Sequence, residues 1–309
     1  MSAHRLRDWR RYAGRTLAIR AADHAARGGV ERIRRWGRLV GEAHYWLGWP
    51  VYRRLRRDIA TALAVPRARA GAILRRAFRE NDRAVFEIIA LSRPNCDPDA
   101  LVDSVRIDDA QRLEDRPGRG NGAILLGMHM GNGILMAARL AREGWPVHIV
   151  FRDPRRLPPG LLGRSIERAG CVPVPLDRDN PTRSFRRMLA ILRDGGVIFA
   201  LMDQANKREG TEKRFLGKRM RMPAGLPGLA VRTGVPIIPI HVLDVDQGWR
   251  FGVQAPLVAE SADAMLDTIC ASMEQAIRAR PELWAWHHRR WKRYPFEPEP
   301  TTTSKPTCR

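Results

Sequence analysis

The first third of the chain has the hydrophobic spacing of helices. Up to about residue 95, apolar residues recur every three or four positions between arginine-rich turns, as at Val85, Ile88 and Ile89. This spacing places the apolar side chains on one face of a helix. The stretch "SRPNCDPDA", with two prolines and two aspartates, ends the pattern. We therefore expect an arginine-rich helical segment over residues 1–99.

From about residue 120, short apolar runs alternate with amphipathic stretches. The runs predict strands at 123–128, 147–152, 196–203, 235–243 and 249–257, and the stretches predict helices at 133–143, 158–169, 182–194, 223–233 and 262–279. Alternation of this kind is typical of a mostly parallel sheet that helices cover on both faces. The pattern predicts an α/β fold for residues 100–297, with a mostly parallel central sheet flanked by helices. The proline- and threonine-rich tail, 298–309, is expected to be disordered.

The longest apolar run, "AILLGMHMGNGILMAARLA" at 123–141, raises the question of a membrane span. Three glycines and Asn132 in its middle would leave a membrane helix poorly packed and partly polar. We read it as a buried strand, a loop that carries His129, and a helix. A second apolar segment, 40–52, is shorter than the ~20 residues that a bilayer requires. Its tryptophans and tyrosines beside arginines favour the headgroup layer.

The charge balance indicates an anionic partner. Lys and Arg number 55 against 33 Asp and Glu, a net charge of +22, and only five of the 55 are lysines. Such an excess attracts nucleic acid, anionic lipid or an acidic carrier protein without choosing among them. Because we find no zinc-finger spacing, RNP-like aromatic run or basic leucine zipper, we expect no nucleic-acid partner.

The cysteines and the N-terminus indicate the compartment. The four cysteines are widely separated and form no C-x-x-C pair, so we expect neither a metal site nor a disulfide scaffold. The charged N-terminal residues include no uninterrupted apolar stretch of the kind that a cleaved signal requires. Both features favour a reducing, cytoplasmic setting.

Three polar residues of different chemistry follow expected strands. His129 follows 123–128, Arg152 ends 147–152, and Asp203 ends 196–203. Ligands of open α/β sheets bind at the carboxyl ends of strands, where these residues are expected to meet. Alone, each has a simpler interpretation: a hydrogen-bonded core histidine, a solvated arginine, or a capping aspartate. Together they supply a base, a cation for an anionic group and a carboxylate that orients the imidazole.

The motifs around these residues resemble a known family. "HMGNG" and the block "DQANKREGTEKRFLGKRMRMPAGLPGLAVRTGVPIIPIHV" (203–242) resemble the late acyltransferases of lipid A biosynthesis, the lauroyl and myristoyl transferases within the lysophospholipid acyltransferase superfamily. "VYRRLRRDIATAL" and "ILRRAFRENDRAVFEIIAL" are similar to the helical lead-in of that family, and "PELWAWHHRRWKRYP" (281–295) to its closing segment. The resemblance spans about residues 51–295 as a pattern of blocks.

The resemblance implies a mechanism and exposes a departure from it. In the family, a histidine deprotonates an acceptor hydroxyl, which attacks the thioester of an acyl chain on acyl carrier protein. A carboxylate five residues after the histidine orients the imidazole, but here that position is Ile134, which accepts no hydrogen bond. We expect Asp203 to substitute, with Glu143 as a weaker candidate. If Asp203 keeps another family role, His129 is unassisted, and the enzyme is slow, inactive, or uses an acceptor that is easier to deprotonate, such as an amine.

Further residues are expected to bind substrate. The glycines of "HMGNG" either let backbone N–H groups approach the thioester oxygen or only permit a tight turn. Cations just before a helix that starts at Pro223 either form a phosphate pocket or an exposed basic loop. The expected substrate-binding residues are Gly131, Asn132, Gly133, Gln204, Lys218, Arg219 and Arg221.

Two functions remain open at this point. The first is a peripheral acyltransferase at the cytoplasmic face of the inner membrane. It would move an acyl chain from acyl carrier protein or acyl-CoA to a hydroxyl or amine of a lipid or small molecule, without metal or redox cofactor. The second is a catalytically reduced relative that binds acyl carrier protein or lipid as a partner protein. A carboxylate within hydrogen-bond reach of the His129 ring would favour the enzyme.

Overall fold

A computed structural model describes residues 16–49, 52–114, 122–153, 157–177, 179–204, 210–246, 248–288, 291 and 294–296. The first 15 residues of the arginine-rich segment and the expected disordered tail, 298–309, lie outside the described residues.

A seven-stranded sheet forms the centre of the fold, in the order β1-β9-β8-β2-β5-β3-β4. Its strands are β1 (Val105–Asp108), β2 (Ala123–Gly127), β3 (Val147–Phe151), β4 (Val172–Pro175), β5 (Val197–Leu201), β8 (Ile237–Asp244) and β9 (Trp249–Val253). Every neighbouring pair is parallel except β8 and β9. All five residues of β2 are buried, as a central strand covered on both faces requires. The expected mostly parallel α/β fold is confirmed.

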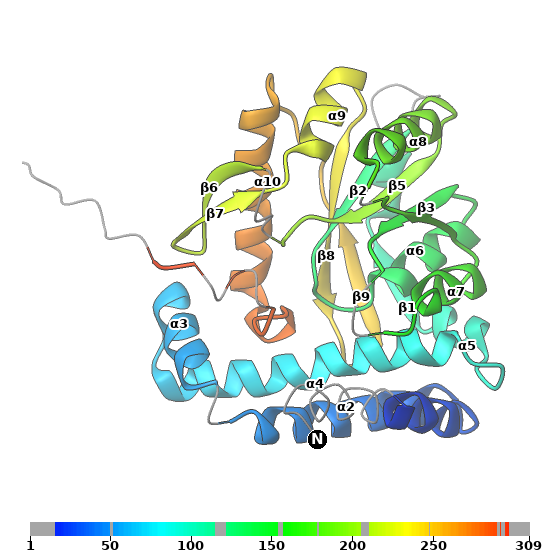
Figure 1. The fold of residues 1–309 in the computed structure, drawn as a ribbon, viewed down its shortest axis with the longest axis vertical. Helices are drawn as coiled ribbons and strands as arrows, with labels where there is room; N and C mark the ends of the chain where they lie inside the picture. Colours follow the sequence, from blue (N-terminus) through cyan, green and yellow to red (C-terminus); the bar gives the residue numbers. More distant parts are fainter. Residues whose placement is uncertain are drawn as a thin grey trace, which may run out of the picture.

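Helices flank the sheet (Figure 1). They are α5 (Pro98–Asp103), α6 (Gly133–Arg142), α7 (Leu161–Arg168), α8 (Pro181–Arg193), α9 (Gly225–Thr233) and α10 (Ala262–Ala279), with 3-10 turns η1 (Ala110–Leu113) and η2 (Pro281–Leu283). Asn132 caps α6 by accepting a hydrogen bond from the Leu135 N–H, and Ser261 caps α10 in the same way. Such caps satisfy backbone donors that a helix start leaves free.

A two-stranded hairpin stands apart from the main sheet. Its strands are β6 (Thr211–Phe215) and β7 (Lys218–Met222), which pair antiparallel. Leu216 and Gly217 connect them with φ angles of 49° and 76°. Two successive positive φ values are the geometry of the tight turns that join hairpin strands. The segment before α9, for which the sequence left a phosphate pocket or an exposed basic loop open, is therefore largely strand.

Helices α2 (Gly29–Leu47), α3 (Arg53–Leu63) and α4 (Arg67–Leu91) form a layer at one end of the sheet (Figure 1). Gly37 and Gly41 let α2 approach α4 closely, since a Cβ at Gly41 would lie 2.5 Å from the Phe78 carbonyl oxygen. Helix α4 in turn contacts α7 and η2, so α2 is the outer helix of the pair. Within the described part of the chain, no helix combines the length and apolar character needed to span a bilayer.

The carboxylate of Glu87 joins this helical layer to the sheet. Its Oε1 accepts hydrogen bonds from Arg34 Nε at 3.3 Å and Arg83 Nε at 3.2 Å. Its Oε2 accepts from Asn132 Nδ2 at 3.0 Å and Trp249 Nε1 at 2.6 Å. Four donors satisfy a carboxylate that is fully buried, as its burial requires. Glu87 thereby fixes the loop after β2 against α4.

Candidate active site

The pairing of β2 with β5 brings His129 and Asp203 together. Gly127 is opposite Leu201 in the register, so each functional residue lies two positions beyond the last pair. His129 Nδ1 is 2.7 Å from Asp203 Oδ1. The convergence that the strand ends predicted is confirmed for these two residues, and a carboxylate lies within hydrogen-bond reach of the ring.

Asp203 is buried and accepts three hydrogen bonds. Besides the ring nitrogen on Oδ1, its Oδ2 accepts from the His129 backbone N–H at 3.0 Å and from Trp284 Nε1 at 2.8 Å. Burial by itself would raise the pKa of Asp203, but the charge and hydrogen bonds of His129 and the bond from Trp284 outweigh it and lower the pKa to about 2. The carboxylate is therefore ionised at neutral pH, and it selects the imidazole tautomer that carries its proton on Nδ1.

The C-terminal segment covers the loop that carries His129. Met130 and Trp284 form an antiparallel bridge, and the Ala285 N–H donates to the His129 carbonyl at 3.0 Å. Trp284, Trp286 and Trp291 are buried and pack edge to face with one another. Sequence reasoning named this segment only within the resemblance and missed its contact with Asp203. Three tryptophans in a short stretch indicated a buried segment, but not where it packs.

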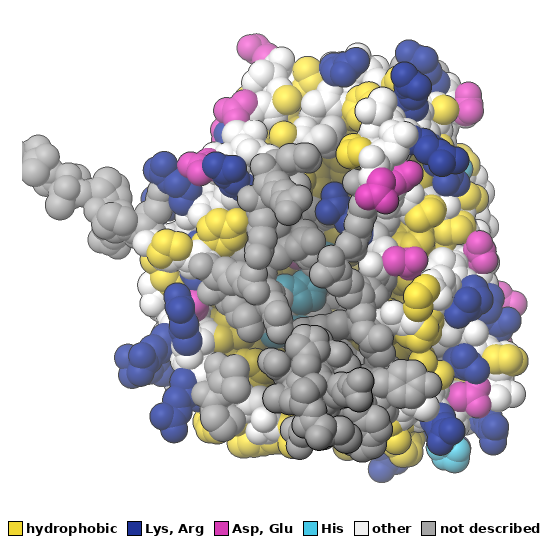
Figure 2. All heavy atoms as spheres, in the orientation of Figure 1, with side chains coloured by type: hydrophobic (Ala, Val, Ile, Leu, Met, Phe, Trp, Pro, Cys, Tyr) yellow, Lys and Arg dark blue, Asp and Glu magenta, His cyan; other side chains and the backbone are white. Residues whose placement is uncertain are grey.

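The second ring nitrogen of His129 faces a glutamine. Gln204 Nε2 lies 2.7 Å from His129 Nε2 and 2.9 Å from His288 Nδ1, so one amide group donates to both rings. The His129 and His288 rings meet edge to face at 4.5 Å between centroids. The His129 side chain is 29% exposed. Figure 2 shows a histidine side chain recessed near the centre of the face that it draws. A substrate hydroxyl or amine can give its proton to Nε2 only if it displaces the Gln204 amide. His288 was not predicted from the sequence.

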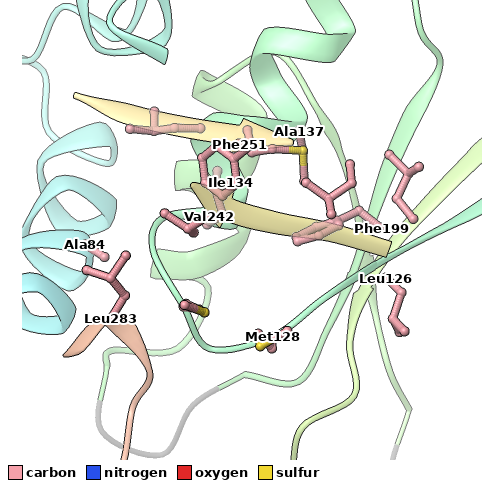
Figure 3. Close-up of a cluster of buried hydrophobic side chains, with 14 of the residues drawn as sticks. Ala84, Leu126, Met128, Ile134, Ala137, Phe199, Val242, Phe251 and Leu283 are labelled. Atoms are coloured by element: carbon pink, nitrogen blue, oxygen red, sulfur yellow. The ribbon is translucent and has the colours of Figure 1, made fainter. Parts of the chain in front are cut away.

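Ile134 lies in the hydrophobic core. It is 7% exposed in the first turn of α6, within the cluster of buried side chains that also includes Val242 and Phe251 (Figure 3). Glu143, the weaker candidate for the orienting acid, ends α6 and pairs with Arg139 at 3.2 Å. Asp203 is therefore the carboxylate that contacts the imidazole.

Steric and hydrogen-bond constraints explain the residue types at positions 131–133. Gly131 has φ of 71°, and a Cβ there would lie 2.8 Å from Val242 Cγ2. A Cβ at Gly133 would lie 2.6 Å from the Phe199 ring. Asn132 is fully buried between its cap and Glu87. These contacts support the tight-turn interpretation, and substrate binding by the three residues stays a prediction.

Arg152 lies at the same carboxyl-terminal end of the strands, in the exposed residues just after β3, which neighbours β5. In the described ranges it has no hydrogen-bond or ion-pair partner, so its guanidinium faces solvent. The structure thus brings His129 and Asp203 into contact and leaves Arg152 beside them. Its catalytic role stays a prediction.

The three cations, for which the sequence left a phosphate pocket or an exposed loop open, lie on two faces of β7. Lys218 is buried, with Nζ 2.8 Å from Asp58 Oδ2 and 3.9 Å from the centroid of the Trp291 ring. Arg219 and Arg221 are exposed and lie 3.9 Å and 3.6 Å from Glu212. The alternation of a strand separates Lys218 from the two arginines. A role in substrate binding stays a prediction for all three.

Burial affects the reactivity of the three described cysteines. Burial raises the pKa of Cys96 to about 11 and the pKa values of Cys171 and Cys270 to about 12, so these thiols are poor nucleophiles. The part of the chain that the structure describes contains no group of three or more His, Cys, Asp or Glu side chains placed to hold a metal ion.

Comparison with known proteins gives a consistent result. A sequence model of the bacterial lipid A biosynthesis acyltransferases matches residues 29–293. The phosphatidylinositol mannoside acyltransferase of Mycobacterium tuberculosis strain H37Rv is 28% identical over 246 residues, covering 77% of this chain and 76% of the relative. The protein of the same name from Mycolicibacterium smegmatis is 27% identical over 242 residues, covering 77% and 78%. The family match includes the helical layer, the His129 loop and the tryptophan-rich segment.

Proposed function

Because the chain belongs to the bacterial lipid A biosynthesis acyltransferase family, a family of enzymes, we propose that it transfers an acyl group from a thioester to a lipid or small-molecule acceptor with His129 as general base. The donor is acyl carrier protein or acyl-CoA, and the acceptor offers a hydroxyl or an amine. The observation that carries the proposal is the 2.7 Å contact between His129 Nδ1 and Asp203 Oδ1. It supplies the orienting acid whose family position is Ile134.

The proposed reaction follows from the tautomer. With Nδ1 donating to Asp203, Nε2 has a free electron pair for the acceptor's proton. The acceptor replaces the Gln204 amide, its oxygen or nitrogen attacks the thioester carbon, and Nε2 takes the proton. The new C–O or C–N bond forms, the C–S bond breaks, and the imidazolium returns its proton to the departing thiolate. Asp203 stabilises the imidazolium throughout.

The proposed acceptor is a membrane lipid with a sugar or related polar headgroup. The M. tuberculosis and M. smegmatis relatives are named for acylation of phosphatidylinositol mannoside, a glycolipid. In the proposal, Arg152 binds an anionic group of the donor or the acceptor at the carboxyl ends of the strands. Gln204, the loop residues 131–133 and the cations of β7 are the remaining candidates for substrate contact.

The proposed location is the cytoplasmic face of the inner membrane, with the protein bound peripherally. Support comes from the end of α2, where Trp46 is 52% exposed and Leu47 85% exposed. Aromatic and apolar residues of this kind, close to arginines, suit the boundary between headgroups and acyl chains. The excess of arginine over acidic residues adds attraction to anionic lipid.

Transfer from defined donors tests the catalytic role. The protein is incubated with a membrane extract and with acyl carrier protein or acyl-CoA that bears chains of different length, and acylated products are identified by mass spectrometry. We expect His129→Ala to lose activity by about 10²–10⁴-fold. The control His148→Ala, whose ring on β3 contacts the Pro146 carbonyl, should keep it. Equal product from wild type and His129→Ala would contradict catalysis and favour a partner protein that binds carrier protein or lipid.

A further inference from the structure

We propose that a groove between α2 and α4 binds the phosphate of an anionic phospholipid headgroup. This inference rests on the membrane-surface part of the proposed function and assigns it to one site. The groove has a volume of about 430 Å³, which falls in the range of small-ligand sites. Residues of both helices line it: Glu31, Arg35, Arg38, Leu39, Glu42, Arg75 and Arg79.

Two of the four arginines in the groove are already paired. Arg38 Nε lies 3.1 Å from Glu80 Oε1, and Arg75 Nε donates to Glu42 Oε1 at 2.6 Å. Glu42 also accepts from Trp46 Nε1 at 2.7 Å. The bond from Arg75 is the main reason that the pKa of Glu42 is lowered, against the opposing effect of burial. Glu42 therefore stays ionised and keeps Arg75 occupied.

The other two arginines are available to a ligand. Arg35 on α2 and Arg79 on α4 are exposed, and neither has an ion-pair or hydrogen-bond partner within the described ranges, although the charge of Arg79 also helps to lower the pKa of Glu42. Four arginines against two glutamates leave the lining with an excess of positive charge. Free guanidinium groups on two sides of a groove suit a phosphate, which accepts paired hydrogen bonds from arginine.

The groove continues into an apolar tip, which favours a lipid over a free phosphate. Leu39 is 56% exposed within the groove, and Trp46, Leu47 and Trp49 are exposed at the end of the same helix. The guanidinium of Arg56 lies 3.4 Å from the centroid of the Trp49 ring. Tryptophan and leucine beside arginine suit insertion at the headgroup layer, which an aqueous ion or an acidic protein does not require.

A row of histidine rings leads from the same end of α2 to His129. His44 on α2 is 6.2 Å from His287, His287 is 5.1 Å from His288, and His288 is 4.5 Å from His129, measured between ring centroids. A headgroup bound in the groove would hold the membrane surface near the opening at His129. Lipid acceptors would then reach the site without leaving the bilayer interface.

Vesicle flotation at 0.15 M salt tests the groove. Phosphatidylglycerol vesicles are compared with phosphatidylcholine vesicles for the wild type and for Arg35→Gln/Arg79→Gln. We expect the wild type to prefer the anionic vesicles and the double variant to bind them about 30-fold more weakly, at roughly fivefold per arginine. The control Arg183→Gln/Arg186→Gln removes the same charge from exposed positions on α8, and it should change binding less than threefold.

Three results would overturn the groove. Equal weakening by the control would mean that the attraction is spread over the surface. The groove would be a site for free phosphate if glycerol phosphate protects its arginines from modification by phenylglyoxal while the double variant binds vesicles as the wild type does. Loss of acyl carrier protein binding with unchanged vesicle binding would mean a protein dock. The transfer assay compares wild type with His129→Ala, and both proteins have the same groove, so a failed groove leaves that test of His129 intact. Flotation requires no acyl donor, so an inactive enzyme leaves the vesicle result intact.

Discussion

Replacing Asp203 by asparagine should remove the base without unfolding the protein. The Asp203 carboxylate accepts three N–H bonds: the imidazole on Oδ1, and the His129 backbone and Trp284 on Oδ2. An amide of the same shape has only one acceptor oxygen. If that oxygen takes the Oδ2 position and keeps two bonds, the amide NH₂ faces Nδ1 and forces the proton of the imidazole to Nε2. The electron pair that the acceptor needs is then lost.

The expected size of the effect follows from both charge and tautomer. In a serine protease, the corresponding aspartate-to-asparagine change lowered kcat by about 10⁴-fold through the wrong tautomer. We expect Asp203→Asn to lower acyl transfer by about 10²–10⁴-fold. The folded-state pKa of about 2, against an ordinary 3.8, also corresponds to about 2 kcal/mol of stability. Because the folded pKa is the lower one, this stability is present above about pH 4 and disappears as the pH falls toward 2.

Two measurements check this prediction. Single-turnover transfer from a thioester donor gives the rate, and ¹⁵N NMR of labelled histidine, with the His129 signal assigned by its absence in His129→Ala, gives the tautomer. Asp153→Asn, an exposed aspartate after β3 at the same sheet edge, serves as control and should leave both unchanged. An Asp203→Asn protein that keeps its rate within threefold, or keeps the proton on Nδ1, would refute the role of Asp203 as orienting acid.

Three further predictions concern stability and reactivity. Burial lowers the pKa of His241 to about 4. As the pH falls from 6.5 to 4, the unfolded state therefore takes up a proton before the folded state does, and the folded state loses stability. His241→Asn should reduce this acid-induced loss by about 3 kcal/mol. Urea unfolding at a series of pH values measures this, and parallel pH profiles would contradict it. Lys218→Met should lower the free energy of unfolding by about 3 kcal/mol because it leaves Asp58 unpaired in a nearly buried position. Adding Asp58→Asn to Lys218→Met should restore part of that stability. A double variant whose loss is the sum of the two single losses would contradict this. In the native protein at pH 7, at most one of the four cysteines should react rapidly with a thiol reagent, because burial raises the pKa values of the three described ones; fast labelling of two or more would count against this.

Much of the fold was predictable because its central strands are apolar throughout. The run 123–127 is buried at every position, and the loop and helix after it begin where the glycines and Asn132 indicate. The strands that were missed carry weaker signals. β4 reads Val-Pro-Val-Pro, and two prolines are tolerated there because β4 lies at the sheet edge and pairs only with β3. The hairpin of β6 and β7 was hidden by its charge, although the alternation in "KRMRM" after a glycine was a usable signal.

The candidate site was predictable as far as strand ends determine it. His129 and Asp203 meet because their strands pair directly, and the sequence places each residue shortly after its strand. The contacts of Trp284 and His288 were not predictable, because they join segments about 80 residues or more apart through the path of the C-terminal segment. No local pattern encodes that path. The separation of Lys218 from Arg219 and Arg221 was missed because the hairpin itself was missed.

The fully buried Glu87 carboxylate limits how this chain can be recombined with its relatives. Its four donors come from α2, α4, the cap of α6 and β9. A chimera that exchanges the N-terminal helices for those of a relative must bring a carboxylate to the same point, or Asn132 and Trp249 lose their acceptor. Exchange between family members should therefore succeed only when these four donors and Glu87 are inherited together.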